Sequence, residues 1–508
     1  MPAQIFFGAG SLDNLGSAPL PGAKALIVIG GTSVRRLGYL DRVQALLKNQ
    51  GVESVVFDKV QPNPVVEHVM EAAALARETG CDFVVGLGGG SSMDSAKSIA
   101  VMAANPGTYW DYIQGGSGKG LPIPNKPLPI VCITTTAGTG TEADPWTVIT
   151  KEDTQEKIGF GFKGTFPTMS IVDPELMLSV PPKLTAYQGF DALFHAVEGY
   201  MATIASPMGD MFALQAIEYI AKYLPRAVSN GDDLEARAYV ALANTYSGFV
   251  ETISCCTSEH SIEHALSAFH PALPHGAGLI MISWAYHEAY APACPERYAR
   301  VAAAMGQEAS VDGFLNGLNK LKEACGVDKL KNIGAALKTC KWMCTGGVNA
   351  KNVNNYLGYN QIIAVGGTWM CKSDVIKAGD WAKITAQSKE AVDTMLGLHL
   401  IHVGINTGNE EEAAKIAGLI STMLNMKVTP GNSSIFVGNK EFEIMKKPGR
   451  GTNGHIAILT NNVDRAIYHL GQRGVKFDMD SKNVKDGKTI AIYFADEIAG
   501  FAFHLVQR

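Results

Sequence analysis

The stretch Phe83-Val-Val-Gly-Leu-Gly-Gly-Gly-Ser-Ser-Met-Asp94 decides the fold that the sequence predicts for the first part of the chain. A short apolar run ending in glycines is typical of a buried strand that turns tightly into a helix. Two similar strands precede it, at residues 24–30 and 54–58, and helical patterns follow them at residues 34–49 and 65–79. Strands that alternate with helices predict right-handed crossovers and a parallel α/β sheet.

The glycine-rich turn fits the diphosphate of a dinucleotide. Because Gly89 and Gly90 have no Cβ atom, the backbone can approach a phosphate closely, and the next helix offers free N–H groups at its amino terminus. A further strand, residues 127–136, runs into a second such turn at residues 134–142, which is rich in threonine. Single glycine-rich turns are common in α/β domains without a nucleotide. Two in one domain favour a Rossmann-like nucleotide-binding domain over residues 1–180.

Residues 181–331 carry long helical patterns and predict an all-helical second domain. Asp191-Ala-Leu-Phe-His195 and His260-Ser-Ile-Glu-His264 each place two side chains four residues apart, on one face of a helix. His275 follows on a Pro-His-Gly turn. A lone Asp-x-x-x-His is usually a solvated pair. Three imidazoles with one carboxylate, among apolar residues, favour a divalent transition metal with open positions for substrate. We expect these side chains to project into the cleft between the two domains.

Composition limits the function classes. The chain has 508 residues, which predicts two to four domains, and its net charge of −5 gives no support for nucleic-acid binding. Neither a signal peptide nor an apolar run of membrane-spanning length is evident, and the nine scattered cysteines fit free thiols in a reducing cytoplasm. We therefore expect a cytoplasmic, homo-oligomeric protein that acts on small molecules and binds no membrane.

Several short pieces of the first 331 residues fit one known pattern. They are Phe7-Gly-Ala-Gly10, Pro62-Asn-Pro64, Gly88 to Asp94, Thr134 to Glu142, Asp173-Pro174, Asp191-x-x-x-His195, His260-x-x-x-His264 and Pro274-His-Gly276. Through these motifs, residues 1–331 resemble the iron-containing (group III) alcohol dehydrogenase family. The resemblance implies a dehydroquinate synthase-like fold and hydride transfer between NAD(P) and a small primary alcohol or aldehyde. A polyol dehydrogenase or a cyclising synthase remains an alternative within that fold.

The resemblance also implies site residues. The metal, Fe²⁺ or alternatively Zn²⁺, would be held by Asp191, His195, His260 and His275. His264 would stand beside the metal, and we consider it a candidate proton relay or else a packing histidine. The residues expected at the cofactor are Gly31, Ser33, Asn63, Gly89, Gly90, Ser91, Asp94, Thr135, Thr136 and Thr139.

The choice between NAD and NADP depends on the end of the first strand. Relatives that prefer NAD often have an acidic residue there, whereas this chain has Gly30-Gly-Thr-Ser33 followed by Arg35 and Arg36. Without the acid a 2′-phosphate is not repelled, and an arginine could pair with it. The sequence therefore favours NADP slightly and leaves NAD open.

Residues 332–397 show another pattern. Two strand-and-turn units, with the glycine turns Thr345-Gly-Gly347 and Gly366-Gly367, resemble the carboxy-terminal end of 2-dehydro-3-deoxyphosphogluconate aldolases. That resemblance implies phosphate-contacting turns and a fragment of a TIM barrel. Two units cannot close an eight-stranded barrel, and the strand that carries the Schiff-base lysine of that family is absent.

Residues 398–508 show two halves of similar type, each with a strand, a helix and further strands. This repeat resembles the vicinal-oxygen-chelate (glyoxalase-like) fold of α+β type. By that resemblance His402, Glu443, His455 and His504 fall where metal ligands occur, although histidines satisfied on half-buried strands are the simpler interpretation. The whole chain is thus expected to be a truncated dehydrogenase fused to an aldolase tail, whether in nature or through the joining of two reading frames. The alternative functions are an aldolase (lyase) in the carboxy-terminal part and a fusion without catalytic activity.

Overall fold

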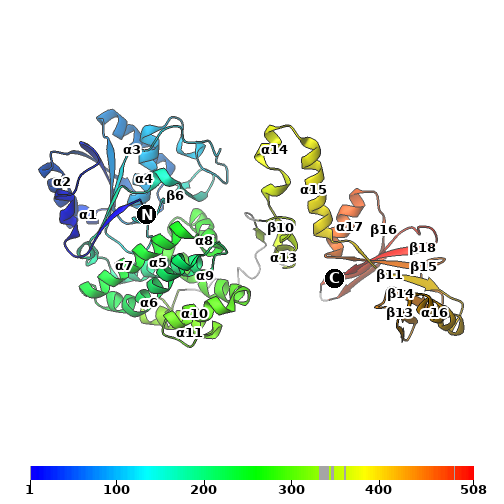
Figure 1. Ribbon diagram of the computed structural model, residues 1–508. Helices are drawn as coiled ribbons and strands as arrows, with labels where there is room; N and C mark the ends of the chain where they lie inside the picture. The colour runs from blue at the N-terminus through cyan, green and yellow to red at the C-terminus, as the bar shows by residue number, and fades with distance from the viewer. Residues whose placement is uncertain (1, 331–341, 345–347, 360–361, 486) are drawn as a thin grey trace. The chain divides into compact units, whose positions relative to one another are not determined.

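The computed structural model describes residues 2–330, 342–344, 348–359, 362–485 and 487–508. The chain divides into two compact units, Met1–Lys338 and Thr339–Arg508, which are described separately (Figure 1). None of the helices in these described ranges has the length and apolar character that crossing a membrane requires.

A six-stranded sheet forms the first layer of the first unit. Its order is β1-β8-β5-β4-β2-β3, and every neighbouring pair is parallel. The strands are β1 (Gln4–Phe7), β2 (Lys24–Gly30), β3 (Glu53–Val60), β4 (Phe83–Gly88), β5 (Ile130–Thr134) and β8 (Met169–Val172). Their apolar residues pack on both faces of the sheet in two separate clusters. The predicted Rossmann-like parallel sheet is therefore confirmed.

Helices cover both faces of this sheet: α1 (Ser33–Arg36), α2 (Tyr39–Asn49), α3 (Val66–Thr79) and α4 (Gly90–Ala104). The single helix predicted over residues 34–49 is wrong, because Gly38 adopts a left-handed φ of 74° and separates α1 from α2. A left-handed residue costs little at glycine and interrupts the helical hydrogen bonds. The predicted strand over residues 127–136 is also shorter than expected and covers only β5.

An antiparallel hairpin was not predicted. Its strands are β6 (Trp146–Lys151) and β7 (Glu156–Gly161), and it packs on α4. The buried Lys97 of α4 holds the chain that enters the hairpin: its Nζ donates to Thr141 Oγ1 at 2.6 Å and lies 3.1 Å from Asp144 Oδ1. Burial raises the pKa of Asp144 to about 7, although Lys97 acts in the opposite direction.

Helices form the second layer of the first unit, as predicted (Figure 1). They are α5 (Pro182–Met201), α6 (Pro207–Ser229), α7 (Leu234–Ile253), α8 (Ser258–Phe269), α9 (His275–Tyr290), α10 (Pro295–Ala304) and α11 (Val311–Ala324). Helix α5 is buried without interruption from Gly189 to Met201, since α6, α7 and α9 surround it. An Asp and a His on such a helix lie away from water and need partners.

The second unit contains an eight-stranded mixed sheet in the order β12-β13-β14-β11-β15-β18-β17-β16. Its first half consists of β11 (His399–Asn406), α16 (Glu410–Leu424), β12 (Val428–Pro430), β13 (Ser434–Val437) and β14 (Phe442–Met445). Its second half repeats that order with β15 (Gly454–Thr460), α17 (Val463–Gln472), β16 (Phe477–Lys485), β17 (Lys488–Phe494) and β18 (Phe501–Gln507). The first strands of the two halves, β11 and β15, pair antiparallel in the middle of the sheet.

A smaller part of the second unit precedes this sheet. It contains β9 (Trp342–Cys344), α13 (Val353–Leu357), β10 (Ile362–Val365), α14 (Ser373–Lys377) and α15 (Trp381–Leu396). Strands β9 and β10 pair in parallel and form a sheet of two strands. The turn expected to bind phosphate at residues 345–347 lies outside the described residues. Within the described ranges no closed barrel surrounds β9 and β10.

Candidate active site

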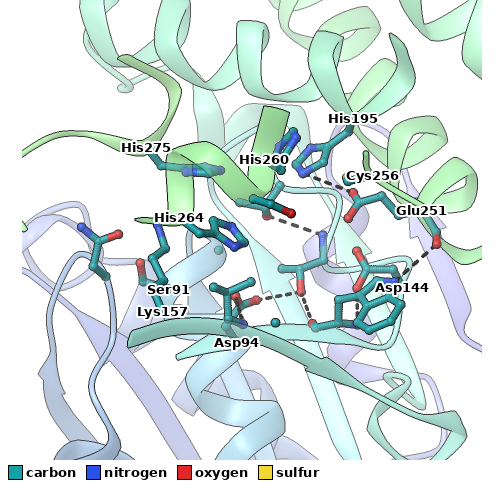
Figure 2. A pocket seen from close by; sticks show the side chains of 18 of the residues that line it. Ser91, Asp94, Asp144, Lys157, His195, Glu251, Cys256, His260, His264 and His275 are labelled. Carbon is teal, nitrogen blue, oxygen red and sulfur yellow. Dashed lines mark hydrogen bonds and ion pairs between the residues drawn. The ribbon is translucent and has the colours of Figure 1, made fainter. Parts of the chain in front are cut away.

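A cavity of about 360 Å³ lies between the sheet layer and the helices of the first unit, which is large enough for a small ligand. Figure 2 shows His195, His260 and His275 on its helical side and Ser91, Asp94 and Lys157 opposite them. The lining also includes Asn63, Gly90, Thr139, Asp144, Glu251, Cys256 and His264.

Three of the four expected metal ligands meet at one point. Oδ1 of Asp191 on α5 lies 3.3 Å from Nε2 of His260, in the first turn of α8, and 3.4 Å from Nε2 of His275, the first residue of α9. Four donors held tetrahedrally about 2.1 Å from a metal lie about 3.4 Å from one another. The spacing therefore fits one divalent ion. Burial alone would raise the pKa of Asp191, but His195 and His275 outweigh it and lower that pKa.

His195 stands at the edge of this group. Its Nδ1 lies 3.7 Å from Asp191 Oδ1, and its Nε2 faces Glu251 Oε1 at 3.6 Å. The ring stacks on His260 with 4.1 Å between centroids, and a second possible donor group combines these two histidines with Cys256. Burial lowers the pKa of His195 to about 3, so the ring is neutral at pH 7 and able to offer a lone pair.

The position of His275 differs from the prediction of a turn. Pro274 is the N-cap of α9, and His275 and Gly276 lie in its first turn. Glycine usually indicates the end of a helix, but Gly276 has a packing reason here, because a Cβ at this position would lie 2.1 Å from the Tyr187 carbonyl oxygen. The close approach of α9 to α5 brings His275 near Asp191.

Two carboxylates that were not predicted from the sequence contact two of the ligand histidines at Nδ1, the ring nitrogen that faces away from Asp191. Glu198 of α5 contacts Nδ1 of His260, and Glu263 of α8 contacts Nδ1 of His275. Both carboxylates are fully buried. The spacing along the helices could have indicated both carboxylates. Glu198 is seven residues after Asp191, on the same face of α5, and Glu263 lies inside the motif that contains His260 and His264.

His264 lines the cavity one helical turn after His260. Its ring centroid lies 5.4 Å from that of His275 and 6.3 Å from that of His260. Burial, with a further contribution from Lys157, keeps the pKa of His264 well below its ordinary value. The ring is thus a neutral group in the cavity and lies beside the group of ligand atoms formed by Asp191, His260 and His275.

The turn between β4 and α4 forms the opposite wall. Gly89 is the N-cap of α4, and a Cβ at Gly90 would lie 2.4 Å from Thr139 Cγ2, so the two glycine-rich turns pack directly on one another. Of the ten residues expected at the cofactor, Asn63, Gly90, Ser91, Asp94 and Thr139 line the cavity. Asp94 also anchors the hairpin, since its Oδ2 accepts a hydrogen bond from Val148 N at 2.9 Å.

The other five residues expected at the cofactor do not line this cavity. Gly89, Thr135 and Thr136 belong to the two glycine-rich turns but are not among the lining residues. Gly31 and Ser33 are exposed and follow the end of β2. Near them, Arg35 Nη2 pairs with Asp58 Oδ2 at 2.8 Å. The arginine considered for a 2′-phosphate therefore has a carboxylate partner in this structure.

A second group of possible metal ligands lies in the second unit. His402 of β11 and His455 of β15 face one another with 3.0 Å between their Nε2 atoms, and each lies 3.3 Å from Glu443 Oε2. His504 of β18 completes the group, and its buried Nε2 has no hydrogen-bond partner. All four residues come from equivalent first or last strands of the two halves. The simpler interpretation of the sequence was that each of these histidines has hydrogen-bond partners on its own strand. For His504 this does not hold, because its Nε2 lacks a partner.

Comparisons with known proteins agree over the first unit. Two family models match, "Iron-containing alcohol dehydrogenase" over residues 2–174 and "Fe-containing alcohol dehydrogenase family, C-terminal" over residues 185–360. The second match extends beyond residue 331, where the resemblance was expected to stop. Neither of these two matches extends beyond residue 360, so neither covers the part for which a glyoxalase-like fold was expected.

Relatives and solved structures give the same result. Choline dehydrogenase of Bacillus subtilis is 38% identical over 312 residues, which are 61% of this chain and 77% of the relative. Alcohol dehydrogenase 4 of Schizosaccharomyces pombe is 38% identical over 54% of this chain and 64% of its own length. A solved archaeal alcohol dehydrogenase from a Red Sea brine pool has a TM-score of 0.62 and 36% identity over 69% of this chain and 89% of its own.

Proposed function

Because the chain belongs to the iron-containing alcohol dehydrogenase family, we propose that it transfers hydride between a nicotinamide cofactor and a small primary alcohol or the corresponding aldehyde. Relatives named methanol, butanol and 1,3-propanediol dehydrogenases support a substrate of this class. The observation that carries the proposal is the meeting of Asp191, His260 and His275 in a cavity opposite the β4–α4 turn.

Asp191, His195, His260 and His275 would hold the metal. A bound divalent ion supplies Lewis-acid stabilisation of charge on the substrate oxygen. The carboxylate of Asp191 would lower the net charge of the site, and imidazole nitrogens together with one carboxylate oxygen suit such an ion. The Nδ1 of His195 lies 3.2 Å from the Gly138 carbonyl oxygen and would donate to it, which leaves the lone pair of the neutral ring on Nε2.

The cofactor would bind along the opposite wall. The backbone N–H groups at the start of α4 suit a diphosphate, and Ser91, Asp94 and Thr139 line the part of the cavity that faces the histidines. For a 2′-phosphate, Arg35 would exchange its present partner Asp58 for the ligand. We therefore retain the slight preference for NADP. His264 is the proposed proton relay, because it lies in the cavity beside His275.

The test uses the purified full chain, loaded with Fe²⁺ under anaerobic conditions and supplied with NAD(P)H and short aldehydes, or NAD(P)⁺ and short alcohols. The absorbance of the reduced nicotinamide reports turnover. We expect metal-dependent turnover that His275→Ala abolishes and His270→Ala, an exposed histidine one residue beyond α8, leaves intact. A folded protein that binds the metal at His275 but shows no turnover with either cofactor would refute the proposal.

For the second unit we propose a glyoxalase-like pair of modules that holds a metal of its own. The repeated strand order of the two halves and the group of His402, Glu443, His455 and His504 support this. Three imidazoles and one carboxylate suit Zn²⁺, Fe²⁺ or Ni²⁺. No specific observation favours an aldolase.

Metal stoichiometry tests this second proposal. Elemental analysis of the full chain should give two metal ions per chain and only one in His402→Ala. The matched control is His399→Ala, which changes an exposed histidine on the same strand β11. Equal metal content in all three proteins would contradict a second site.

A further inference from the structure

A buried chain of contacts links the β6–β7 hairpin of the first unit to a proposed metal ligand. Lys157 of β7 has its Nζ 3.5 Å from Glu263 Oε2 and 2.8 Å from Ser267 Oγ, both on α8. The same oxygen of Glu263 contacts Nδ1 of His275. The side chains of Lys157 and Glu263 are 5% and 0% exposed, so solvent screens this pair very little.

The geometry decides which nitrogen of His275 is free. When Nδ1 donates to Glu263, the lone pair is on Nε2. That atom is the one directed at Asp191 Oδ1, 3.4 Å away. Glu263 therefore fixes both the tautomer and the ring orientation that a metal at this point requires.

The surrounding backbone leaves space for this carboxylate. A Cβ at Gly278 of α9 would lie 2.8 Å from Glu263 Oε1, so a larger residue there would displace it. Gly278 is three residues after His275 and thus lies one helical turn along α9. The glycine lets the carboxylate enter between the two helices.

On the basis of the proposed function, we propose that Glu263 is the positioning residue for His275 and that Lys157, from the β6–β7 hairpin, holds Glu263 in place. Metal affinity in the helical layer then depends on a lysine that does not touch the metal. The arrangement differs at His260, where Glu198 accepts its other hydrogen bonds from the Thr257 hydroxyl group and from the backbone N–H groups of Thr257, Glu259 and His260, and not from a cation. A buried carboxylate deprived of its cation is costly, so removing Lys157 should disturb Glu263 and, through it, His275.

Glu259 supplies a matched control on the same helix. It is fully buried and lies 3.1 Å from Nε2 of His287, which is not among the proposed ligands. Glu259→Gln measures the general cost of losing a buried Glu–His pair in α8. Glu263→Gln measures the same cost together with the loss of His275 positioning.

The experiment measures Co²⁺ binding to the full chain by competition with a chelator, together with the visible absorption bands of the bound Co²⁺. To isolate the first unit, the His402→Ala background removes the other proposed site. We expect Glu263→Gln to raise the Co²⁺ dissociation constant by about 10- to 100-fold and to change the absorption bands. Lys157→Met should raise it by at least about threefold, and the double variant should be no weaker than Glu263→Gln alone.

The outcomes separate this inference from the proposed function. If Glu263→Gln and Glu259→Gln have the same Co²⁺ dissociation constant, Glu263 does not position His275. If the effects of Lys157→Met and Glu263→Gln on that constant add fully, Lys157 does not act through Glu263. Either result refutes this inference but not the metal site itself. If His275→Ala does not weaken Co²⁺ binding in the first unit, the proposed function itself fails. Thermal melts of each variant identify any loss of binding that comes from unfolding.

Discussion

Replacement of Gly276 by alanine should displace a metal ligand by a calculable distance. The new Cβ would lie 2.1 Å from the carbonyl oxygen and 2.7 Å from the carbonyl carbon of Tyr187, well inside the separation of about 3.5 Å at which nonbonded atoms attract most strongly. Because that carbonyl is part of the tightly packed helix α5, the first turn of α9 must withdraw, by about 1 Å. His275 would move with it and open the 3.4 Å gap between Nε2 and Asp191 Oδ1.

The loss in activity follows from that displacement. A misplacement of about 1 Å at a reacting centre costs about 100-fold in rate, which corresponds to about 2.7 kcal/mol of transition-state stabilisation. We therefore expect kcat/KM to fall by about 100-fold and the metal dissociation constant to rise by about 10-fold.

The assay compares Gly276→Ala with Gly209→Ala, in which the nearest atom to the new methyl lies 3.6 Å away, an ordinary contact. Both glycines lie in the first turn of a helix. Steady-state kinetics and metal competition should separate the two variants. Equal metal affinity and equal kcat/KM in both would show that α9 adapts without moving His275, and the reasoning would be wrong.

Two other perturbations give measurable results. Burial lowers the pKa of Lys322 to about 8, below about 10.4 in the unfolded chain. The ammonium therefore costs stability below pH 8, and this cost fades as the pH rises towards 10.4. Lys322→Met should abolish this rise with pH, because the group that titrates is gone. Parallel urea titrations at pH 7 and 9.5 check this, and identical pH slopes in both proteins would contradict it. Arg35→Ala, which removes the partner of Asp58, should weaken NADPH binding by about 10-fold and change NADH binding little, as fluorescence titration would show; equal losses for both cofactors would exclude a 2′-phosphate contact.

Local spacing allowed the sequence to predict much of the site. Asp191 and His195 are four residues apart, and so are His260 and His264, so a helix places each pair on one face whatever the rest of the chain does. The β4–α4 turn was predictable because a buried strand and three glycines allow few other conformations. The same arguments located β2, β3, β4 and β5 to within a few residues, whereas β1 and β8 were not predicted.

Features that depend on distant contacts were not predictable in this way. Gly276 indicated a turn, and only the backbone of Tyr187 explains why a helix begins there. The hairpin of β6 and β7 depends on the buried Lys97 in α4, and the His195 ring is held through its Nδ1 by the Gly138 carbonyl oxygen. Glu198 and Glu263 had the right spacing, but a glutamate on a helix is usually solvated, and its burial becomes evident only when the helices are packed.

The edge strand β1 has a consequence for the synthesis of the protein. In the described part of the chain it pairs with β8 alone, with Gln4 beside Met169, and the Asp173 carboxylate after β8 accepts hydrogen bonds from the backbone N–H groups of Gly10 and Leu12. The residues of β1 are translated before β8 and therefore wait for their partner until some 165 more residues have been added. Such a long loop is slow to close, so β1 is an unpaired edge until β8 has been translated, and its docking is expected among the last steps by which the nascent sheet becomes complete.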